Sequence, residues 1–326
     1  MLYPLKFQPI YKEKIWGGKN LMAYCNKDLS GREDIGESWE IADHYEDNSI
    51  ILNGELKGRS LNEALKEFKR DLVGTKPEEK FLDRFPLLIK FIDAHDKLSV
   101  QVHPDDQYAE LHEKGEYGKT EMWYVVHADR GAKLIMGLNQ NVTPDEFKHH
   151  LETNDVEDIL QYVEVKTGDV LFIPAGRIHA ILPGVVIYEV QQNSDLTYRV
   201  YDWGRMGFDN QPRPLHIEKS IQTINFRDVN PNISKIHYSH INTNVMANLT
   251  HCLYFHVEKY LLNEKMKFIS DRSTFSIFSV MDGFGLLNWE NREIELNKGD
   301  TVLIPAVLAS YTIYPQPLLT LVRSCA

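Results

Sequence analysis

Hydrophobic and polar positions along the chain predict a small number of short helices. Residues 60–72 carry leucine and phenylalanine side chains at helical spacing. Ser60 is placed to cap this helix, and Glu63, three positions later, completes a capping box. A second helix is expected to begin at Thr143-Pro144, because proline is favoured in the first turn of a helix.

Most of the remaining pattern is typical of short, buried strands. Residues 85–94 and 97–104 form two such apolar runs. Over residues 163–204 strands of similar length recur between glycine and proline turns, as in a sandwich or barrel. A further helix is expected over residues 215–224. The pattern therefore predicts a mainly β protein with a few inserted helices.

A polar segment separates two β-rich parts of the chain. Residues 225–245 are rich in asparagine, serine and histidine, and the strand pattern resumes after them. The length of 326 residues is sufficient for two hydrophobic cores. We therefore divide the chain into a first domain, residues 1–235, and a smaller second domain, residues 236–326.

The two parts share a sequence phrase. Residues 168–175 (GDVLFIPA) resemble residues 299–306 (GDTVLIPA), and the strands around each copy are also similar. We interpret this similarity as an internal duplication of a β-roll. The alternative is that both copies are a common turn–strand–turn phrase.

The first copy continues into a Pro-x-Gly-x2-His motif. Gly176 lets the chain reverse after Pro174, and this reversal points the ring of His179 into the mouth of a barrel. The second copy has Val307 and Ser310 at the corresponding positions. Since it lacks both the turn glycine and the histidine, we expect no metal in the second domain.

Two further pairs of polar residues can complete a metal site with His179. Gln101 and His103 lie two positions apart, hence on one face of a strand, and Lys119 and Glu121 repeat this spacing. With His179, the set offers two imidazole nitrogens, one carboxylate and one amide oxygen. Such donors suit zinc with one position left open, as in a catalytic rather than a structural site.

Composition and charge limit the possible partners. A net charge of −11 argues against nucleic acid and gives no basic segment for a membrane surface. It also repels anionic substrates at long range, so a phosphate site requires a local cationic pocket. Cys25, Cys252 and Cys325 form no CxxC pair, and the N-terminal segment lacks the apolar core of a signal peptide. These features favour a cytoplasmic protein with reduced thiols.

Seven motifs are distributed from about residue 7 to residue 219: WGG, IGESWEI, FPLLIKFIDA, LSVQVHPDD, GKTEMWYV, GDVLFIPAGRIHAI and QQNSDLTYRVYDWGR. Together they resemble the type I phosphomannose isomerases, in particular the shorter bacterial form, within the cupin superfamily. The resemblance implies a cupin or jelly-roll β-barrel catalytic domain with a smaller, degenerate cupin-like domain behind it. It also implies zinc-dependent interconversion of mannose 6-phosphate and fructose 6-phosphate through an enediol.

Carried over position by position, the resemblance places the ligands of one zinc ion per chain at Gln101, His103, Glu121 and His179. The same comparison places an active-site arginine at Arg199 and further pocket residues at Lys119 and Glu189. The motif here is Gln-x-His rather than the general cupin His-x-His, with a long insert before Glu121. Both departures are normal for the family and distinguish it from iron-dependent cupin oxygenases.

The roles of the catalytic candidates are only partly assigned by the sequence. Arg199 is expected to hold the enediolate, a substrate hydroxyl or the phosphate. Lys119 should point toward the metal and take part in proton transfer. Glu189 is either the proton-transferring base or a residue that orients a ligand or Arg199, and the phosphate-binding residues stay unassigned.

Other polar residues in the motifs receive structural interpretations. Asp105 and Asp106 are expected to cap a helix that begins near Gln107. Packing of the strands that wrap the barrel is expected for Trp16, Glu37, Trp39 and Glu40, with substrate contact as the alternative. The substrate is a small sugar phosphate, and we expect a monomer or a weak homodimer.

Two alternative functions are compatible with the ligand set. An iron-dependent cupin oxygenase would also use two histidines and a carboxylate. A non-catalytic, sugar-binding or regulatory β-roll protein is the other alternative, although Arg199 and the intact ligand set argue against it.

Overall fold

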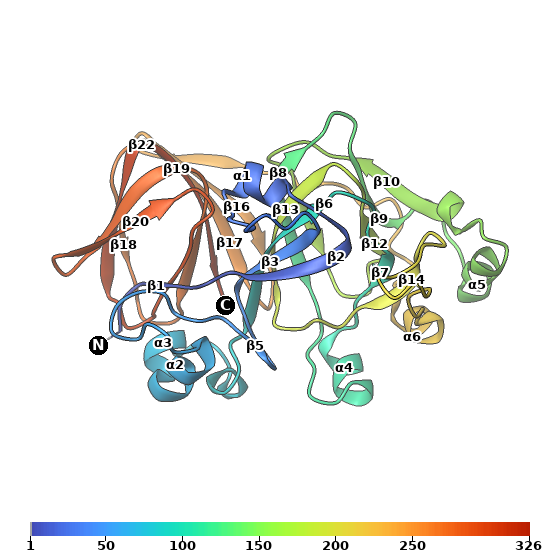
Figure 1. Ribbon diagram of the computed structural model, residues 1–326, viewed down its shortest axis with the longest axis horizontal. Helices are drawn as coiled ribbons and strands as arrows, with labels where there is room; N and C mark the ends of the chain where they lie inside the picture. The colour runs from blue at the N-terminus through green and yellow to red at the C-terminus, as the bar shows by residue number, and fades with distance from the viewer. Residues whose placement is uncertain (1) are drawn as a thin grey trace.

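Strands dominate the computed structural model, which describes residues 2–326. Figure 1 shows two β-barrels side by side, one built mainly from the first two thirds of the chain and the other from its last third. The prediction of a mainly β fold with a few helices is confirmed.

A six-stranded antiparallel sheet forms one wall of the first barrel. Across this sheet the strands are, in order, β11 (Val170–Ile173), β8 (Glu121–Ala128), β13 (Val185–Gln192), β6 (Leu87–Ala94), β3 (Ile35–Ile41) and β2 (Ile10–Gly18). Strands β13 and β6 are buried along their whole length. Ile187 packs inside the first barrel, whereas its neighbour Tyr188 packs in the core shared with the second barrel. Both faces of the sheet are covered, which explains its uninterrupted apolar runs.

A five-stranded antiparallel sheet forms the opposite wall. Its strands are, in order, β10 (Leu160–Glu164), β9 (Lys133–Leu138), β12 (His179–Ile181), β7 (Val100–Val102) and β14 (Tyr198–Tyr201). Leu134 and Met136 of β9 pack against Trp123 of the facing sheet. Phe147 and Ile221 belong to the cluster that covers the outer face. The site residues therefore lie between two sheets whose other positions are filled with apolar side chains.

The second barrel is a single nine-stranded sheet. Seven of its strands follow one another in the order β1 (Leu5–Lys6), β21 (Thr301–Ile304), β19 (Ser276–Trp289), β22 (Ser310–Cys325), β17 (His256–Leu262), β16 (Asn244–His251) and β15 (Tyr238–Ile241). In addition, β18 (Met266–Ile269) pairs with β22, and β20 (Arg292–Asn297) pairs with β19. The N-terminal strand β1 belongs to this sheet, where Leu5 pairs with Leu303. The division into domains at residue 235 stays a prediction. The second barrel also contains a strand, β1, from the other end of the chain.

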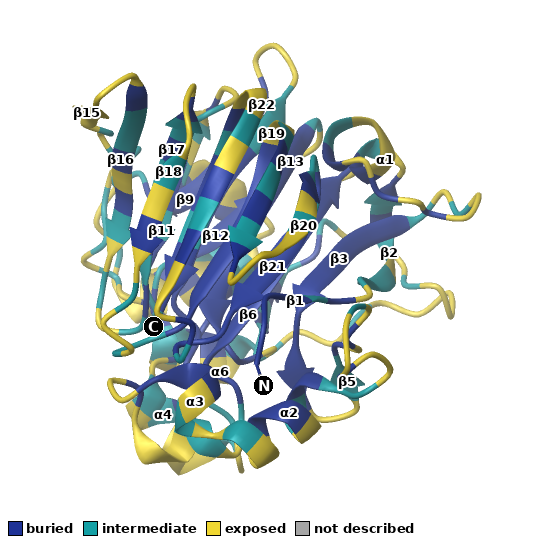
Figure 2. Cartoon of the chain, turned by 90° about the vertical axis from the view of Figure 1, so that its left-hand side faces the viewer, coloured by how far each residue is buried: buried dark blue, intermediate teal, exposed yellow. Residues whose placement is uncertain are grey.

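The two barrels share a hydrophobic core along the outer face of the six-stranded sheet. The hydroxyl of Tyr188 accepts a hydrogen bond from Ser279 Oγ at 3.0 Å, and that of Tyr124 accepts one from Lys259 Nζ at 2.9 Å. Figure 2 shows β13 and β3 buried through the middle of the molecule, beside the strands of the second barrel. The second barrel thus supports the wall that carries Glu121 and Glu189.

The predicted helix over residues 60–72 is divided into α2 (Leu61–Phe68) and α3 (Arg70–Val73). The capping box of Ser60 and Glu63 is present as predicted. The single long helix is wrong, because Lys69 has a φ of 42° and interrupts it. The break turns the carbonyl of Leu72 toward the second barrel, where it accepts a hydrogen bond from Ala306 N at 3.0 Å. A long-range contact therefore overrides the local helical pattern.

The other predicted helices are confirmed within a few residues. Thr143 and Glu146 form a capping box at the start of α5 (Pro144–Glu152). Asp105 caps α4 (Asp106–His112) through the amide of Tyr108 at 2.8 Å. The remaining short elements are α1 (Asn20–Cys25), α6 (Ile217–Thr223), the 3₁₀ turns Glu79–Leu82 and Val156–Ile159, and the hairpin of β4 (Asp43–His44) and β5 (Asp47–Asn48).

The three cysteines are not bonded to one another: Cys25 and Cys325 are buried, and Cys252 is partly buried. Within residues 2–326, no helix combines the length and the apolar character that a membrane crossing requires.

A buried ion pair fastens the N-terminal segment to the second barrel and gives a first prediction. Lys27 Nζ lies 2.6 Å from Glu40 Oε2 and donates to the carbonyl of Gly299 at 2.6 Å. Lys27→Met leaves the Glu40 carboxylate buried without its cation, which costs about 3–5 kcal/mol. We expect a thermal midpoint several degrees lower, and partial recovery when Glu40→Gln is added. An unchanged midpoint in the single variant would contradict this role.

Candidate active site

Three buried side chains that can bind a metal ion lie together inside the first barrel. They are His103 after β7, Glu121 at the start of β8 and His179 at the start of β12, and their ligand atoms all lie within 4.8 Å of one another. His103 Nε2 is 3.2 Å from Glu121 Oε1, and His179 Nε2 is 3.8 Å from Glu121 Oε2. Two imidazoles and a carboxylate are typical zinc donors.

Gln101 lies beside this cluster. It is directly opposite His179 in the pairing of β7 and β12, and its side-chain amide is 3.4 Å from His179 Nε2. Side chains two positions apart in a strand point to the same face, which places Gln101 beside His103. The structure therefore brings all four predicted ligand residues together.

Both imidazole rings are held by backbone carbonyls. His103 Nδ1 lies 2.7 Å from the carbonyl oxygen of Leu196, and His179 Nδ1 lies 2.8 Å from that of Arg177. A carbonyl oxygen only accepts, so each Nδ1 carries the proton and each Nε2 presents its lone pair to Glu121. This is the arrangement of metal-binding histidines whose outer partners fix the tautomer.

Burial keeps the two imidazoles neutral. Burial first, and then the ammonium group of Lys119, lower the pKa of His103. Burial and the neighbouring His103 lower the pKa of His179 to about 3. Burial opposes the ionisation of Glu121, but the ammonium group of Lys119 outweighs it and holds the pKa of this carboxyl well below its usual value. The site thus contains two neutral imidazoles and one carboxylate.

Lys119 occupies the side of the cluster that faces the cavity. Its Nζ atom is 2.7 Å from Glu121 Oε1 and 3.3 Å from His103 Nε2. The lysine and the glutamate lie two positions apart and share one strand face. Lys119 is therefore within hydrogen-bonding distance of two ligand residues, as the sequence spacing suggested.

Glu189 lies on β13, across the strand pair from Trp123 of β8. Its Oε1 atom accepts a hydrogen bond from Trp123 Nε1 at 2.7 Å, whereas Oε2 is buried with no hydrogen-bond partner among residues 2–326. Burial, and then the like charge of Glu121, raise the pKa of Glu189 to about 8. A carboxyl with a pKa near neutrality suits proton transfer.

Lys90, which also lines the cavity, lies close to three carboxyl groups. Its Nζ atom is 3.6 Å from Glu37, 3.9 Å from Glu189 and 3.6 Å from Asp195. Burial lowers the pKa of this ammonium group, but the carboxylates outweigh it and raise the pKa above its ordinary value. Lys90 is not among the predicted site residues. A lysine inside the apolar run of residues 85–94 nevertheless indicates a buried charge that needs partners.

Arg199 on β14 provides a cationic end to the cavity. One of its Nη atoms donates to the carbonyl of Pro214 at 2.9 Å, and its Nε is buried without a hydrogen-bond partner in the part of the chain described. Burial, and then the positive charge of Arg213, lower the pKa of Arg199. Arg213 lines the same cavity and is paired with Asp202, which leaves Arg199 as the guanidinium group of the two that can face an anionic substrate.

One cavity of about 300 Å³ joins the metal-ligand cluster, the Lys90 cluster and the two arginines. Its lining includes the predicted residues Gln101, Lys119, Glu121, Glu189 and Arg199, together with Lys14, Trp16, Glu37, Lys90, Ser99, Asp195, Thr197 and Arg213. The packing interpretation of Trp16 and Glu37 was therefore incomplete. Trp39 and Glu40 are buried, and Trp39 Nε1 donates to Glu37 Oε2 at 2.6 Å.

Asp105 and Asp106 differ in their roles, although both follow the His-Pro dipeptide. Asp105 caps α4, as predicted. Asp106 instead accepts hydrogen bonds from Gly118 N at 2.8 Å and from Gln192 Nε2 at 3.0 Å. Neither residue lines the active-site cavity.

A β-barrel that buries two histidines and a glutamate beside a polar cavity defines a cupin-type enzyme with a candidate metal site. Residues 4–120 match the model of the phosphomannose isomerase type I catalytic domain, and residues 246–325 match the mannose-6-phosphate isomerase cupin domain. The chain is 38% identical, over 95% of each chain, to mannose-6-phosphate isomerase ManA of Bacillus subtilis. It belongs to the family of type I phosphomannose isomerases, enzymes that interconvert an aldose and a ketose, and the resemblance of its motifs is confirmed.

Solved structures agree with this assignment. The mannose 6-phosphate isomerase from Bacillus subtilis superposes with a TM-score of 0.90 at 35% identity over 99% of each chain. A mannose 6-phosphate isomerase bound with zinc and yttrium has the same fold, with a TM-score of 0.75 at 17% identity over 99% of each chain.

The raised pKa of Glu189 predicts how stability depends on pH. The folded protein keeps this proton up to about pH 8, whereas the unfolded chain releases it near 4.5. Stability from this group therefore falls as pH rises between these two values. In metal-free protein, Glu189→Gln should reduce the drop in thermal midpoint over this range. The exposed Glu290→Gln variant should follow the wild type, and identical curves for all three proteins would disprove the burial argument.

Proposed function

We propose that this protein interconverts D-mannose 6-phosphate and D-fructose 6-phosphate with one zinc ion per chain, held by Gln101, His103, Glu121 and His179. The observation that carries this proposal is the buried cluster of His103, Glu121 and His179 beside a cavity that Arg199 and Arg213 also line. Membership of the family supplies the substrate.

The donor atoms of the cluster fit zinc. Both imidazoles present Nε2 toward the carboxylate, since their Nδ1 atoms are bound to carbonyl oxygens. Glu121 Oε2 is buried and has no hydrogen-bond partner within residues 2–326, so it is available to a cation. Nitrogen and oxygen donors of this kind suit zinc, the metal of the solved isomerase that has the same fold.

Bound there, zinc supplies a Lewis acid that stabilises negative charge on the substrate oxygens. The protein's own residues position the open-chain sugar and move the proton. Arg199 holds an anionic oxygen of the substrate, because its guanidinium group is permanently charged and its Nε lacks a partner. Lys119 lies on the same side of the cavity and donates a hydrogen bond or a proton to the reacting oxygens.

Glu189 is our candidate for the group that carries the proton between C1 and C2 through an enediol. Its Oε2 is not used in any hydrogen bond among the described residues, and its pKa lies near working pH. The hydrogen bond from Trp123 fixes the other oxygen at 2.7 Å. A base held by one oxygen keeps the other oriented toward the substrate.

Removal of the metal tests the central proposal. Purified protein should contain one zinc per chain and form fructose 6-phosphate from mannose 6-phosphate, and chelation should abolish this activity until zinc is restored. His179→Ala should lose both zinc and turnover, because it removes a buried ligand. His240→Ala, at an exposed position on β15, should keep both. A zinc-loaded protein without isomerase activity would reject the proposal.

The same purified protein distinguishes an isomerase from the alternative, an iron-dependent cupin oxygenase. An iron-dependent oxygenase consumes oxygen and loses activity when zinc replaces iron. We expect no oxygen uptake with either metal, and full isomerase activity with zinc.

Substitution of Glu189 distinguishes proton transfer from orientation. If Glu189 is the base, Glu189→Gln lowers kcat about 10²–10⁴-fold while zinc content and KM stay close to those of the wild type. A variant that instead loses zinc or raises KM with little change in kcat would assign Glu189 an orienting role. Turnover and metal content should be measured on the same preparation.

A cytoplasmic location and a monomeric or weakly dimeric state remain predictions. Size-exclusion chromatography with light scattering tests the second.

A further inference from the structure

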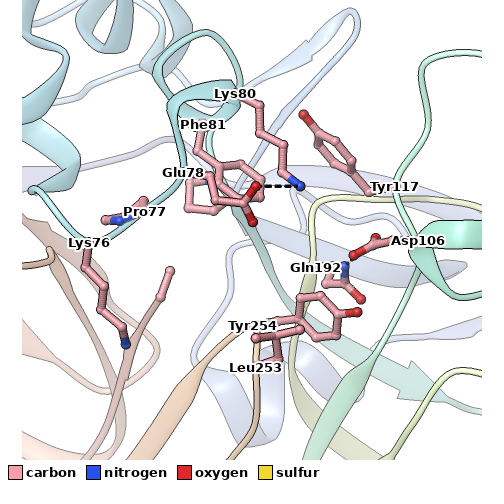
Figure 3. Close-up of a pocket in the computed structure, with 12 residues that line it drawn as sticks. Lys76, Pro77, Glu78, Lys80, Phe81, Asp106, Tyr117, Gln192, Leu253 and Tyr254 are labelled. Carbon is pink, nitrogen blue, oxygen red and sulfur yellow. Dashed lines mark hydrogen bonds and ion pairs between the residues drawn. The ribbon is translucent and has the colours of Figure 1, made fainter. Parts of the chain in front are cut away.

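A second cavity, of about 270 Å³, lies at the junction of the two barrels and shares no lining residue with the active-site cavity. Figure 3 shows three separate segments around it. Residues 76–86 lie on one side, Asp106 and Tyr117 on another, and the turn with Leu253 and Tyr254 of the second barrel below. Packing of the two barrels therefore determines its shape.

Aromatic rings form much of this junction cavity. The ring centroids of Phe81 and Tyr117 are 5.6 Å apart at an interplanar angle of 61°, and Tyr254 lies on the other side (Figure 3). Pro77 and Pro86 are buried and complete the apolar surface. Aromatic and proline side chains therefore make up much of the lining, which favours a ligand with an aromatic ring.

Lysine ammonium groups lie at the rim of the junction cavity. Lys80 Nζ is 5.1 Å from the ring centroid of Phe81 and 5.5 Å from that of Tyr117. Its carboxylate partner Glu78, at 3.3 Å, has a side chain that is 71% exposed, so an anionic ligand group can replace it. Lys76 adds a second exposed cation.

The side of the junction cavity across from Phe81 carries polar side chains, among them a carboxylate. Asp106 lies beside the Tyr254 hydroxyl, and burial together with this carboxylate raises the pKa of the tyrosine. Gln192 is buried next to Asp106 and donates to it at 3.0 Å. A carboxylate beside aromatic faces is suited to an amino group on a planar ring.

We propose that the junction cavity binds a small aromatic anion of the nucleoside monophosphate class and that its occupancy is transmitted to the active site. The ring lies among Phe81, Tyr117 and Tyr254, with an amino group toward Asp106. The phosphate lies at the rim and pairs with Lys80. A cavity slightly below the usual range for small ligands, about 300–1,000 Å³, encloses the ring and leaves the charged group at the surface.

A first hydrogen-bond route connects this cavity to the metal-ligand cluster. Gln192 lines the junction cavity, and its Oε1 accepts a hydrogen bond from the amide of Thr120 at 2.9 Å. Thr120 lies between Lys119 and Glu121. A shift of Gln192 therefore acts on residues 119–121, where β8 begins and which carry both active-site side chains.

A second route runs through the backbone of Tyr117. Its carbonyl accepts a hydrogen bond from Ser194 Oγ at 2.8 Å, and Ser194 Oγ accepts one from Leu196 N at 3.3 Å. The carbonyl of Leu196 is the partner of His103 Nδ1 at 2.7 Å. Two independent contacts thus join the walls of the junction cavity to residues that orient Glu121 and His103.

Binding of adenosine 5′-monophosphate (AMP) tests the site. Calorimetric titration of the zinc-loaded protein, with fructose 6-phosphate saturating the active site, should show one AMP per chain. Adenosine and ribose 5-phosphate should each bind at least about tenfold more weakly, because one lacks the anion and the other the ring. Tyr254→Ala should weaken AMP by about tenfold, in line with loss of one base-stacking ring.

The control for this substitution is Tyr238→Ala, an exposed tyrosine on β15 of the same sheet, which should bind AMP like the wild type. No detectable AMP binding, binding abolished by fructose 6-phosphate, or equal binding of AMP and ribose 5-phosphate would each overturn the proposal. Binding is measured directly and requires no turnover. The loss of affinity in Tyr254→Ala assigns AMP to the junction cavity even if fructose 6-phosphate does not occupy the active site.

Transmission to the active site is tested by kinetics and rests on the proposed function. Saturating AMP should change kcat/KM for mannose 6-phosphate at least about threefold, within the usual strength of coupling between sites. Ser194→Ala, at a position outside the cavity lining, should still bind AMP but show a reduced change, since it removes the link between Tyr117 and Leu196. Unchanged kcat/KM in an active, AMP-bound enzyme would refute transmission, whereas inactivity without AMP would count against the proposed function alone.

Discussion

The ion cluster around Lys90 is the interaction on which the active-site barrel depends. A single ammonium group, almost completely buried, lies within 3.9 Å of carboxylates from Glu37, Glu189 and Asp195. The ammonium group alone would be costly to remove from water, and it is tolerated because the carboxylates of Glu37 and Asp195 compensate its charge. The cluster therefore has to assemble as a unit. Beside it, Lys119 holds Glu121 ionised, whereas burial and the charge of Glu121 leave Glu189 poised near neutrality.

The second barrel packs on the outer face of the sheet that carries these buried charges. A sheet that carries buried charges on its inner face needs firm packing on its outer face, or local motion would admit water. Tyr124 and Tyr188 provide that packing, and each is also hydrogen-bonded to a residue of the second barrel. The pairing of β1 with β21 and the buried pair of Lys27 and Glu40 fasten the same junction. A domain that has lost its own histidine motif therefore contributes directly to the rigidity of the active site.

Local signals in the sequence predicted much of the fold and of the site. The capping boxes at Ser60 and Thr143 are present because their hydrogen bonds join residues three apart. The ligand residues are brought together because two-residue spacing and a Pro-x-Gly turn fix side-chain direction. The missed features depend on distant partners. The break at Lys69 serves a contact with Ala306, and the role of Lys90 appears only when three other segments supply carboxylates.

The binding of an anionic substrate depends on the charges near the cavity more than on the net charge of the protein. A net charge of −11 would repel a sugar phosphate from the surface, yet solution ions screen such a field beyond about 8 Å at physiological salt. Inside the cavity, where screening is weak and distances are short, the lining cations outnumber the carboxylates of Glu37, Glu121 and Asp195; they are Lys14, Lys90, Lys119, Arg199 and Arg213. An anion that reaches the cavity therefore meets the local cations rather than the average charge. The acidic surface then affects mainly the rate of encounter, which should rise with ionic strength, and has little influence on how the bound substrate is held.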